Sequence, residues 1–495
     1  SGCASACAGG SAAASGCASA AAAGSSAACG AGSSAAGGST ASGEPTGASA
    51  SATTASLGGA SCAASLAAAR ASSSGAGTGV SSGSEGVLSS AMTSKVVPPR
   101  ASGRVATAAG AGGVQGYDAV DPWIAEHAAA IAARAERELE ALVAVSTPSG
   151  DVHAAEEAAA LVAALAPAEA EVERPPCSSP EHAPDLLLRV RGTGRRRMLL
   201  LGHLDTVIAH ADHRPLHRED DRLVGSGAVD MKGGDVLALG VLRALTTRPA
   251  DFAEVALMLV MDEEWRLGGF AHVPRFAGFD ACLCFEAGQL ADDDREAVIV
   301  KRKAAGTVEV LAHGRSAHSG SAPDRGANAL LALAAAAQAI AACHAPHGPQ
   351  RLTAVPTVIR SGDAFNVVPA AGELVCDVRA DELAAFDAVL AAVPDEVGGA
   401  RLQARLMREW PGMDARAATA PLLASAAEAL GRPILGAARG GASDASHFAG
   451  EIPLTVDGLG PRGGGAHAPH EYVLAASLRP RAEVALAVAD AALRS

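Results

Sequence analysis

Short clusters of acidic residues and histidine follow apolar segments in the central part of this chain. Three such segments, Met198 to Leu201, Val255 to Met261 and Ala281 to Phe285, are rich in Leu, Val, Met or Cys and have the length of buried strands. Stretches with helical periodicity, such as Met231 to Leu245, lie between them. Because strands that alternate with helices form a mostly parallel sheet covered on both faces, the sequence predicts a three-layer α/β fold.

Five polar clusters accompany these segments. They are Gly202 to Thr206 (Gly-His-Leu-Asp-Thr), Asp230, Asp262 to Glu264 (Asp-Glu-Glu), Glu286 and His467. In open α/β sheets, ligands bind beyond the carboxyl ends of the strands, where four of these clusters are expected or open the next helix. Histidine and carboxylate from separate strand ends are the donors of catalytic dinuclear metal sites. Carboxylates beside buried strands would be costly without a cation, so the clusters together indicate a pair of metal ions.

The spacing within the clusters suggests different roles for their members. His203 and Asp205 are two residues apart and share one face of an extended segment. A metal-bound imidazole usually donates its second N–H to a carboxylate, so Asp205 is interpreted as the group that orients His203. Glu263 and Glu264 are adjacent and point to opposite sides of an extended backbone, which favours one ligand and one general base. Asp230 can offer one oxygen to each of two ions about 3.5–4 Å apart.

The region from about residue 306 to 410 has a different pattern, which predicts a compact α+β unit. Its expected elements are a strand at 307–312, an Ala-rich helix at 328–343, strands at 352–360 and 373–379, and a helix at 381–393. We expect this unit to be a ferredoxin-like domain inserted into a first domain that comprises residues 121–305 and 411–495. Within the first domain, the segments 186–190 and 198–201 flank a Gly-Thr-Gly turn and are predicted to form a hairpin-like pair.

Residues 1–120 are dominated by Ala, Ser and Gly and contain few large apolar side chains. Such a segment buries too little surface to offset its ordering entropy, so it is predicted to be disordered. It has four basic and three acidic residues, which leaves a net charge of −15 for residues 121–495 of a chain whose net charge is −14. An acidic folded part is a poor partner for nucleic acid or an anionic membrane.

Cysteine usage and the absence of export signals indicate a reducing compartment. Five of the ten cysteines lie in the first 120 residues, and the others lack C-x-x-C spacing. Cys282 and Cys284, in an apolar run, are interpreted as small core residues. We find no signal-peptide pattern at the start of the chain and no 18-residue apolar stretch, and we expect a cytoplasmic protein.

The order of motifs along the chain resembles the dizinc peptidase family that includes glutamate carboxypeptidase, acetylornithine deacetylase, succinyl-diaminopimelate desuccinylase and aminoacylase. The resemblance covers residues 121–495 and is strongest to the glutamate carboxypeptidase (carboxypeptidase G) branch. The motifs that carry it are Gly-His-Leu-Asp-Thr-Val (202–207), Gly-Ala-Val-Asp-Met-Lys-Gly-Gly (227–234), Asp-Glu-Glu (262–264), Phe-Glu-Ala-Gly (285–288), Gly-Arg-Ser-Ala-His-Ser-Gly (314–320), Phe-Asn-Val-Val-Pro (365–369), Asp-Val-Arg (377–379), Ala-Ser-Asp-Ala (442–445) and Gly-Ala-His-Ala-Pro-His-Glu-Tyr-Val (465–473).

The resemblance implies a zinc-peptidase catalytic domain, an inserted dimerisation or lid domain, and two zinc ions per chain, for which Co²⁺ or Mn²⁺ could substitute. His203, Asp230 and Glu286 would hold one ion, and Asp230, Glu264 and His467 the other. His467 competes with His470 and is preferred because the family places its ligand four residues before the glutamate that Glu471 matches. Glu263 would be the general base and Asp205 the orienting carboxylate.

The resemblance also implies residues that act outside the metal cluster. His318 would reach the oxyanion of a neighbouring chain in a homodimer built through residues 306–410. Asn366 and Arg379 would contact substrate, and the forked donors of Arg379 suit a substrate carboxylate.

The implied function is metal-dependent hydrolysis of an amide bond in a small peptide or N-acyl amino acid. An N-acyl amino acid deacylase of the same family is an alternative. A noncatalytic binding protein on this scaffold is a second alternative, although every position that catalysis needs is filled. A third interpretation assigns the function to residues 1–120 as an interaction tail. Full activity of residues 121–495 alone would argue against a role for this tail in catalysis.

Overall fold

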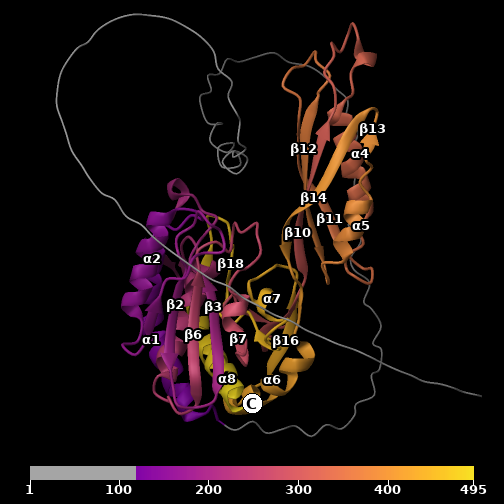
Figure 1. Cartoon of the computed structure of the whole chain (residues 1–495). Helices are drawn as coiled ribbons and strands as arrows, with labels where there is room; N and C mark the ends of the chain where they lie inside the picture. The colour runs from indigo at the N-terminus through magenta and orange to yellow at the C-terminus, as the bar shows by residue number, and fades with distance from the viewer. Residues whose placement is uncertain (1–118) are drawn as a thin grey trace, which may run out of the picture. The chain divides into compact units, whose positions relative to one another are not determined.

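The computed structural model describes residues 119–495 (Figure 1). The predicted disorder of residues 1–120 therefore concerns a segment that lies almost entirely outside the described residues.

A six-stranded sheet forms the centre of the first part of the fold, and four neighbouring strands of it are parallel. Two antiparallel strands extend one edge. In spatial order the strands are β1 (Glu171–Glu173), β2 (Leu186–Arg191), β6 (Phe252–Val260), β3 (Arg196–His203), β7 (Ala281–Cys284) and β17 (Leu454–Val456). The apolar segments that end in polar clusters are thus neighbouring parallel strands, and their carboxyl ends meet at one edge of the sheet.

Alternating residues of these strands pack into two different cores. Met198 and Leu200 of β3 face a core that includes α1, α3, α6 and α8, whereas Leu199 and Leu201 face a smaller core that includes α7. The helices are α1 (Pro122–Ala144), α2 (Val152–Leu165), α3 (Gly233–Leu245), α6 (Arg416–Leu430), α7 (Ala445–Phe448) and α8 (Leu478–Arg494). The sheet is therefore covered on both faces, and the α/β prediction is confirmed.

The predicted pairing of the strands at 186–190 and 198–201 is wrong. Both strands form, but β6 lies between them, antiparallel to β2 and parallel to β3. The turn after β2 forms hydrogen bonds with the start of β6. In these bonds the N–H groups of Gly192 and Gly194 donate to the carbonyls of Ala253 and Phe252. Short sequence separation favours a hairpin, but β6 is buried along almost all of its length and pairs with β2 on one side and with β3 on the other.

The chain between residues 304 and 410 forms an antiparallel five-stranded sheet with its own hydrophobic core (Figure 1). The strands, in spatial order, are β11 (Thr353–Ser361), β12 (Ala371–Ala380), β10 (Ala304–His313), β14 (Ala400–Trp410) and β13 (Glu396–Val397). Helices α4 (Ala329–Ala342) and α5 (Ala385–Ala391) contribute to that core. The long strand β14 has no counterpart in the sequence prediction. The bounds 306–410 of an inserted domain remain a prediction.

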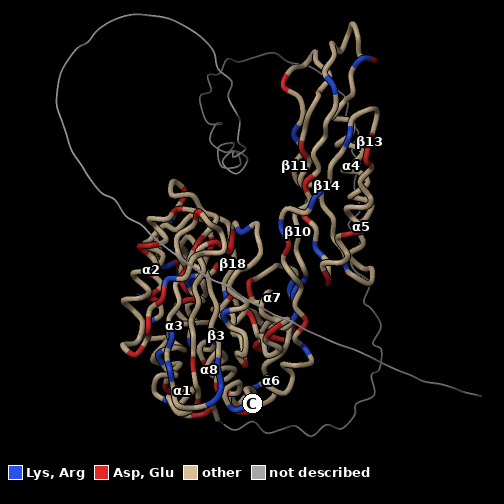
Figure 2. The backbone as a smooth tube through the Cα atoms, in the orientation of Figure 1, with Lys and Arg blue, Asp and Glu red and all other residues tan. Residues whose placement is uncertain are grey.

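Two small sheets complete the described chain. One consists of β8 (Gln289–Leu290), β9 (Glu296–Arg302), β15 (Met413–Asp414) and β16 (Ile434–Arg439), and the other of β4 (His217–Glu219), β5 (Arg222–Val224), β18 (Gly463–Gly464) and β19 (Tyr472–Leu474). Lys and Arg are interspersed with Asp and Glu along the backbone (Figure 2). Among residues 119–495, no helix has the length and hydropathy needed to cross a membrane. Cys282 and Cys284 are free and buried in β7.

Candidate metal centre

His203 ends strand β3 and is almost completely buried. Its Nε2 atom lies 3.2 Å from Oδ1 of Asp230 and 3.8 Å from Oε1 of Glu286. Asp230 lies in the turn Ala228–Lys232 before α3, and Glu286 follows β7. His203, Asp230 and Glu286 therefore form one group that could hold a metal ion.

His467 forms a second group on the other side of the same aspartate. Its Nε2 atom lies 3.0 Å from Oε1 of Glu264 and 3.2 Å from Oδ2 of Asp230. His467 lies in the loop between β18 and β19 and has a φ of 63°, a left-handed conformation that is uncommon and costly for a residue with a Cβ atom. The two oxygens of Asp230 thus face two different histidines, as expected for a carboxylate shared by two ions.

The ionisation of these groups reflects the crowding of carboxylates in a buried place. Burial, followed by the charge of Asp230, raises the pKa of Glu286 to about 8. Hydrogen bonds to Asp230 and Glu264 raise the pKa of His467 to about 11. Burial lowers the pKa of His203, but hydrogen bonds to Asp205 and Asp230 outweigh it and raise that pKa well above its usual value. A divalent cation would reverse these shifts by stabilising the carboxylates and competing for the imidazoles, so the donor set fits a metal.

Asp205 contacts both the histidine and the backbone of the glutamate pair. Nδ1 of His203 lies 3.1 Å from the carbonyl oxygen of Asp205 and 3.4 Å from its Oδ1. An Nδ1–H that donates to this carbonyl leaves the lone pair of Nε2 directed at Asp230. The two carboxylate oxygens of Asp205 accept the backbone N–H groups of Glu263 and Glu264, each at 3.1 Å. Ser149 Oγ also donates to Asp205.

Glu263 is buried next to the first histidine. One ligand atom from each of Glu263, Glu264 and His203 lies within 4.8 Å of the others. Burial raises the pKa of Glu263 well above its usual value. Its backbone N–H is held by Asp205, as noted above, and its carbonyl oxygen accepts a hydrogen bond from Arg408 at 3.3 Å.

Glu471 holds the turn that carries Asp230. Its buried carboxylate accepts the N–H groups of Gly227 and Val229 at 2.8 Å and that of Asp230 at 3.0 Å. Burial raises the pKa of Glu471 to about 7, although these three hydrogen bonds oppose the shift. No role was predicted for Glu471 from the sequence, although its position next to a loop that carries a candidate ligand could have indicated one.

His318 and Asn366 lie next to each other, and within the described part of the chain neither forms a hydrogen bond with a candidate metal ligand. His318 pairs with Val367 through the backbone, and Ser319 N–H donates to the carbonyl of Asn366. Nδ1 of His318 accepts the N–H groups of Gly320 and Ser321 at 3.1 and 3.2 Å. The ring proton is therefore on Nε2, which is free to donate.

Arg379 lies at the opposite end of the five-stranded sheet. It pairs with Ala305 at the start of β10, whereas His318 follows the end of β10 at His313. Its guanidinium group contacts Asp377 at 3.1 Å and lies 3.5 Å from the carbonyl of Gly440.

Other histidines have different surroundings. His470, the competitor of His467, is exposed, and His210 and His217 are exposed with carboxylate neighbours Asp151 and Glu219. His213 is partly buried, and its Nε2 atom has no hydrogen-bond partner among residues 119–495.

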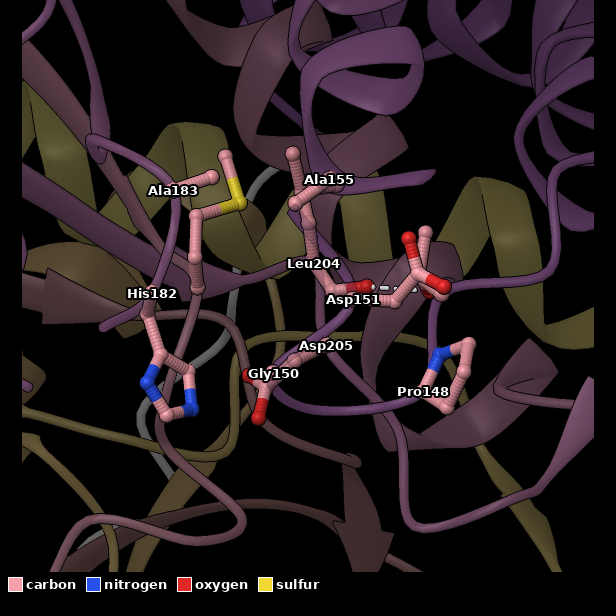
Figure 3. Close-up of a pocket in the computed structure, with 10 residues that line it drawn as sticks. Pro148, Gly150, Asp151, Ala155, His182, Ala183, Leu204 and Asp205 are labelled. Atoms are coloured by element: carbon pink, nitrogen blue, oxygen red, sulfur yellow. Dashed lines mark hydrogen bonds between the residues drawn. The ribbon is translucent and has the colours of Figure 1, made fainter. Parts of the chain in front are cut away.

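A small pocket lies beside the end of β3 (Figure 3). It is lined by Asp205 and Leu204, by the turn that contains Gly150 and Asp151, and by His182. Asp205 is the only predicted site residue among its lining residues, so the pocket adjoins the orienting carboxylate rather than the candidate ligands.

Comparisons of sequence identify relatives of this chain. The profile of "Peptidase family M20/M25/M40" matches residues 199–491. Carboxypeptidase G2 of Pseudomonas sp. (strain RS-16) is 26% identical over 300 residues, which cover 58% of this chain and 71% of that protein. The succinyl-diaminopimelate desuccinylase of Methylobacterium nodulans is 32% identical over 235 residues, which cover 43% of this chain and 58% of that enzyme. The match thus spans less than two thirds of the desuccinylase.

Solved structures share the fold at low sequence identity. Aminopeptidase PepT from Bacillus cereus has a TM-score of 0.59 at 19% identity, covering 73% of this chain and 98% of that chain. The M20 family metallo-carboxypeptidase Sso-CP2 from Sulfolobus solfataricus has a TM-score of 0.56 at 14% identity, covering 72% and 98%. The chain therefore belongs to peptidase family M20/M25/M40 and is a hydrolase of the carboxypeptidase or deacylase type.

Proposed function

We propose that this protein hydrolyses an amide bond in a small peptide or N-acyl amino acid, using two zinc ions held around Asp230. The observation that carries the proposal is the position of the Asp230 carboxylate, with one oxygen 3.2 Å from the imidazole of His203 and the other 3.2 Å from that of His467. Each imidazole also lies near a glutamate, Glu286 or Glu264. One histidine, one terminal glutamate and a shared aspartate per ion is a donor set that zinc accepts.

Zinc ions bound there would lower the pKa of a water molecule and polarise the carbonyl of the substrate. Glu263 is the residue that takes the proton from the attacking water, because its carboxylate lies beside His203 and Glu264, next to the candidate ligands. The same carboxyl group then returns the proton to the leaving amine. Asp205 holds the His203 ring and the Glu263 backbone in position during this proton transfer.

His318 is assigned to the oxyanion of a second chain. Strand β10 has ten residues and therefore spans roughly 30 Å. The start of this strand connects to the part of the chain that holds the candidate ligands, and the loop with His318 follows its other end. Its Nε2–H is available because Nδ1 accepts two backbone N–H groups. A homodimer through the 306–410 region would bring this donor to a developing negative charge.

Asn366 and Arg379 are assigned to the substrate. Arg379 lies near the carbonyl of Gly440, in the loop that leads to Ser443 and Asp444. An arginine fork binds a carboxylate with two parallel hydrogen bonds, so substrates that end in a free carboxylate are favoured. The similarity to carboxypeptidase G2 supports a glutamate carboxypeptidase-like reaction, and the similarity to a desuccinylase supports deacylation of an N-acyl amino acid as the second candidate.

Metal analysis combined with a hydrolysis screen tests the proposal. The purified protein is expected to contain about two zinc ions per chain and to release amino acid from N-acyl amino acids or from dipeptides, especially those that end in glutamate. His467→Ala should lower the metal content and abolish turnover. His470→Ala, an exposed histidine three residues away, is the matched control and should leave both unchanged. A protein that binds one metal or none, or that hydrolyses none of these amides, would contradict the proposal.

A further inference from the structure

The peptide backbone at Glu263 is held from two sides by residues of different sheets. Its N–H donates to Oδ1 of Asp205, which follows strand β3, at 3.1 Å. Its carbonyl accepts Nη2 of Arg408, near the end of strand β14, at 3.3 Å. We propose that Arg408 is a positioning residue for Glu263, which it holds through the Glu263 carbonyl from the five-stranded sheet. This inference rests on the proposed role of Glu263 as the general base.

Arg408 is itself fixed by a buried aromatic ring. Its guanidinium carbon lies 4.4 Å from the ring centroid of Trp410, which is completely buried. The guanidinium carbon of Arg266 lies 5.0 Å from the same ring. Two arginines on one indole gain cation–π attraction but repel each other, so the arrangement requires nearby negative charge.

Two aspartates supply that charge and connect the ring to the base. Arg266 is fully buried, and it donates from Nη1 to Asp262 at 2.9 Å and from Nη2 to Asp444. Asp262 directly precedes Glu263, and its carbonyl accepts the N–H of Arg266 at 2.8 Å. The turn from residue 262 to 266 is therefore anchored on Trp410 through Arg266, while Arg408 holds the carbonyl of Glu263 directly.

This arrangement makes the orientation of the base depend on the five-stranded sheet. Arg408 and Trp410 belong to β14, which pairs along its length with β10, whereas Glu263 follows β6 of the six-stranded sheet. Arg408 donates a hydrogen bond to a backbone atom of Glu263, and within residues 119–495 it forms no hydrogen bond or ion pair with a candidate metal ligand. Its loss should therefore misplace the carboxylate while leaving the ligands in position, and a displacement of about 1 Å can cost about 10²-fold in rate.

The test compares Arg408→Gln, Arg408→Lys and Arg405→Gln by kcat, KM, metal content and melting temperature, on a substrate that the wild-type protein hydrolyses. Arg405 lies on the same strand and pairs with Glu309 at 2.5 Å, so it is a matched control. We expect Arg408→Gln to lower kcat by about 10- to 100-fold, with KM within about twofold and the metal content unchanged. Arg408→Lys should recover part of kcat, because the ammonium group keeps a cation beside Trp410 and one donor for the carbonyl.

Several outcomes would overturn the inference. An unchanged kcat in Arg408→Gln, a raised KM with unchanged kcat, a loss of metal, or an equal loss in Arg405→Gln would each do so. If Arg408→Gln does not fold, Trp410→Phe provides the second variant, and it should lower kcat without changing KM because a smaller ring holds Arg408 less firmly. Glu263→Gln is measured alongside. If this variant is as active as the wild type, the proposed function fails, whereas an inactive Glu263→Gln with a fully active Arg408→Gln refutes only the positioning role.

Discussion

Asp230 and Glu263 have contrasting environments although both are carboxylates near His203. Asp230 contacts the imidazoles of His203 and His467, and its hydrogen bonds with them outweigh burial and keep its pKa low. Within the described part of the chain Glu263 has no such pair of partners, and burial raises its pKa. Two carboxylates whose environments drive their pKa values apart are typical of a ligand and an acid–base catalyst in one site.

Glu263→Gln should retain the metal ions but lose turnover. The amide has the same shape as the carboxyl group but accepts no proton, and general acid–base catalysis typically contributes about 10²- to 10⁴-fold. Metal content and kcat measured on the same preparation check this expectation. Substantial activity in the variant would refute the assignment of the base, and loss of metal would make Glu263 a ligand instead.

His447 should make the fold sensitive to acid. Its ring packs against Trp410 and Phe270, and burial, with the charges of Arg266 and Arg408, lowers its pKa to about 3. The unfolded histidine has a pKa near 6.5, so between about pH 6.5 and 3 the unfolded chain binds a proton that the folded chain does not. The free energy of unfolding should therefore fall as the pH falls through this range.

His447→Gln should reduce that loss of stability. Urea unfolding at pH 7 and pH 4.5 would show a smaller difference in the free energy of unfolding for the variant than for the wild type. His217→Gln, at an exposed histidine of β4, is the control and should behave like the wild type. Equal pH dependence in all three proteins would contradict the expectation.

Helix α3 and the strand ends form the framework of the metal centre, and glycine permits their close approach. A Cβ atom at Gly234, the second residue of α3, would lie 1.9 Å from the carbonyl oxygen of Phe285, next to Glu286. The sequence predicted this helix from Met231, but it begins at Gly233 because Asp230 and Met231 have non-helical dihedral angles. The extended conformation of Asp230 directs its carboxylate between the two histidines.

Gly234→Ala should destabilise the protein and weaken metal binding. The methyl group must displace the backbone at Phe285 and shift Glu286, and overpacking of this kind typically costs about 1–3 kcal/mol. Thermal unfolding and metal titration measure the two effects. Gly450→Ala is the control, because a Cβ atom there would have no neighbour within 4 Å. A Gly234→Ala variant with wild-type stability would show that this contact is readily relaxed.

Exposed apolar residues on the five-stranded sheet are consistent with the proposed homodimer. Val355 and Ile359 on its edge strand β11 are 43% and 47% exposed, and Phe365, beside Asn366, is fully exposed. An edge strand with exposed apolar residues is suited to pairing with a second copy. The same region carries His318, at the end of the sheet away from β9.

Mixed dimers provide a test of this shared site. His318→Ala chains and Glu263→Gln chains should each be inactive, or nearly so, as pure proteins. If chains exchange freely, about half of the dimers are mixed, each with one intact site, so the mixture should recover roughly a quarter of the wild-type rate. Mixing Glu263→Gln with His467→Ala chains, whose defects both lie in the metal centre, is the comparison. A monomeric and fully active protein would contradict the expectation.

The sequence by itself determined the α/β class and the candidate ligand set, because buried strands that end in histidine or carboxylate leave a pattern readable over a few residues. These patterns indicated His203, Asp230, Glu286, His467 and one of the adjacent pair Glu263 and Glu264. The resemblance to the peptidase family selected Glu264 as the ligand and favoured His467 over His470, and the structure brings these side chains together.

Only the tertiary structure decided which strands are neighbours, since β6, which begins at Phe252, lies between β2 and β3, which ends at His203. It also showed that Glu471 holds the backbone at Asp230, and it introduced Arg408, whose hydrogen bond to the backbone at Glu263 has no local signature in sequence. The physical reason is that a metal ligand can be recognised in the sequence by the chemistry of its own side chain. A residue that positions the ligand instead binds a distant backbone N–H or C=O group, and almost every residue carries these groups.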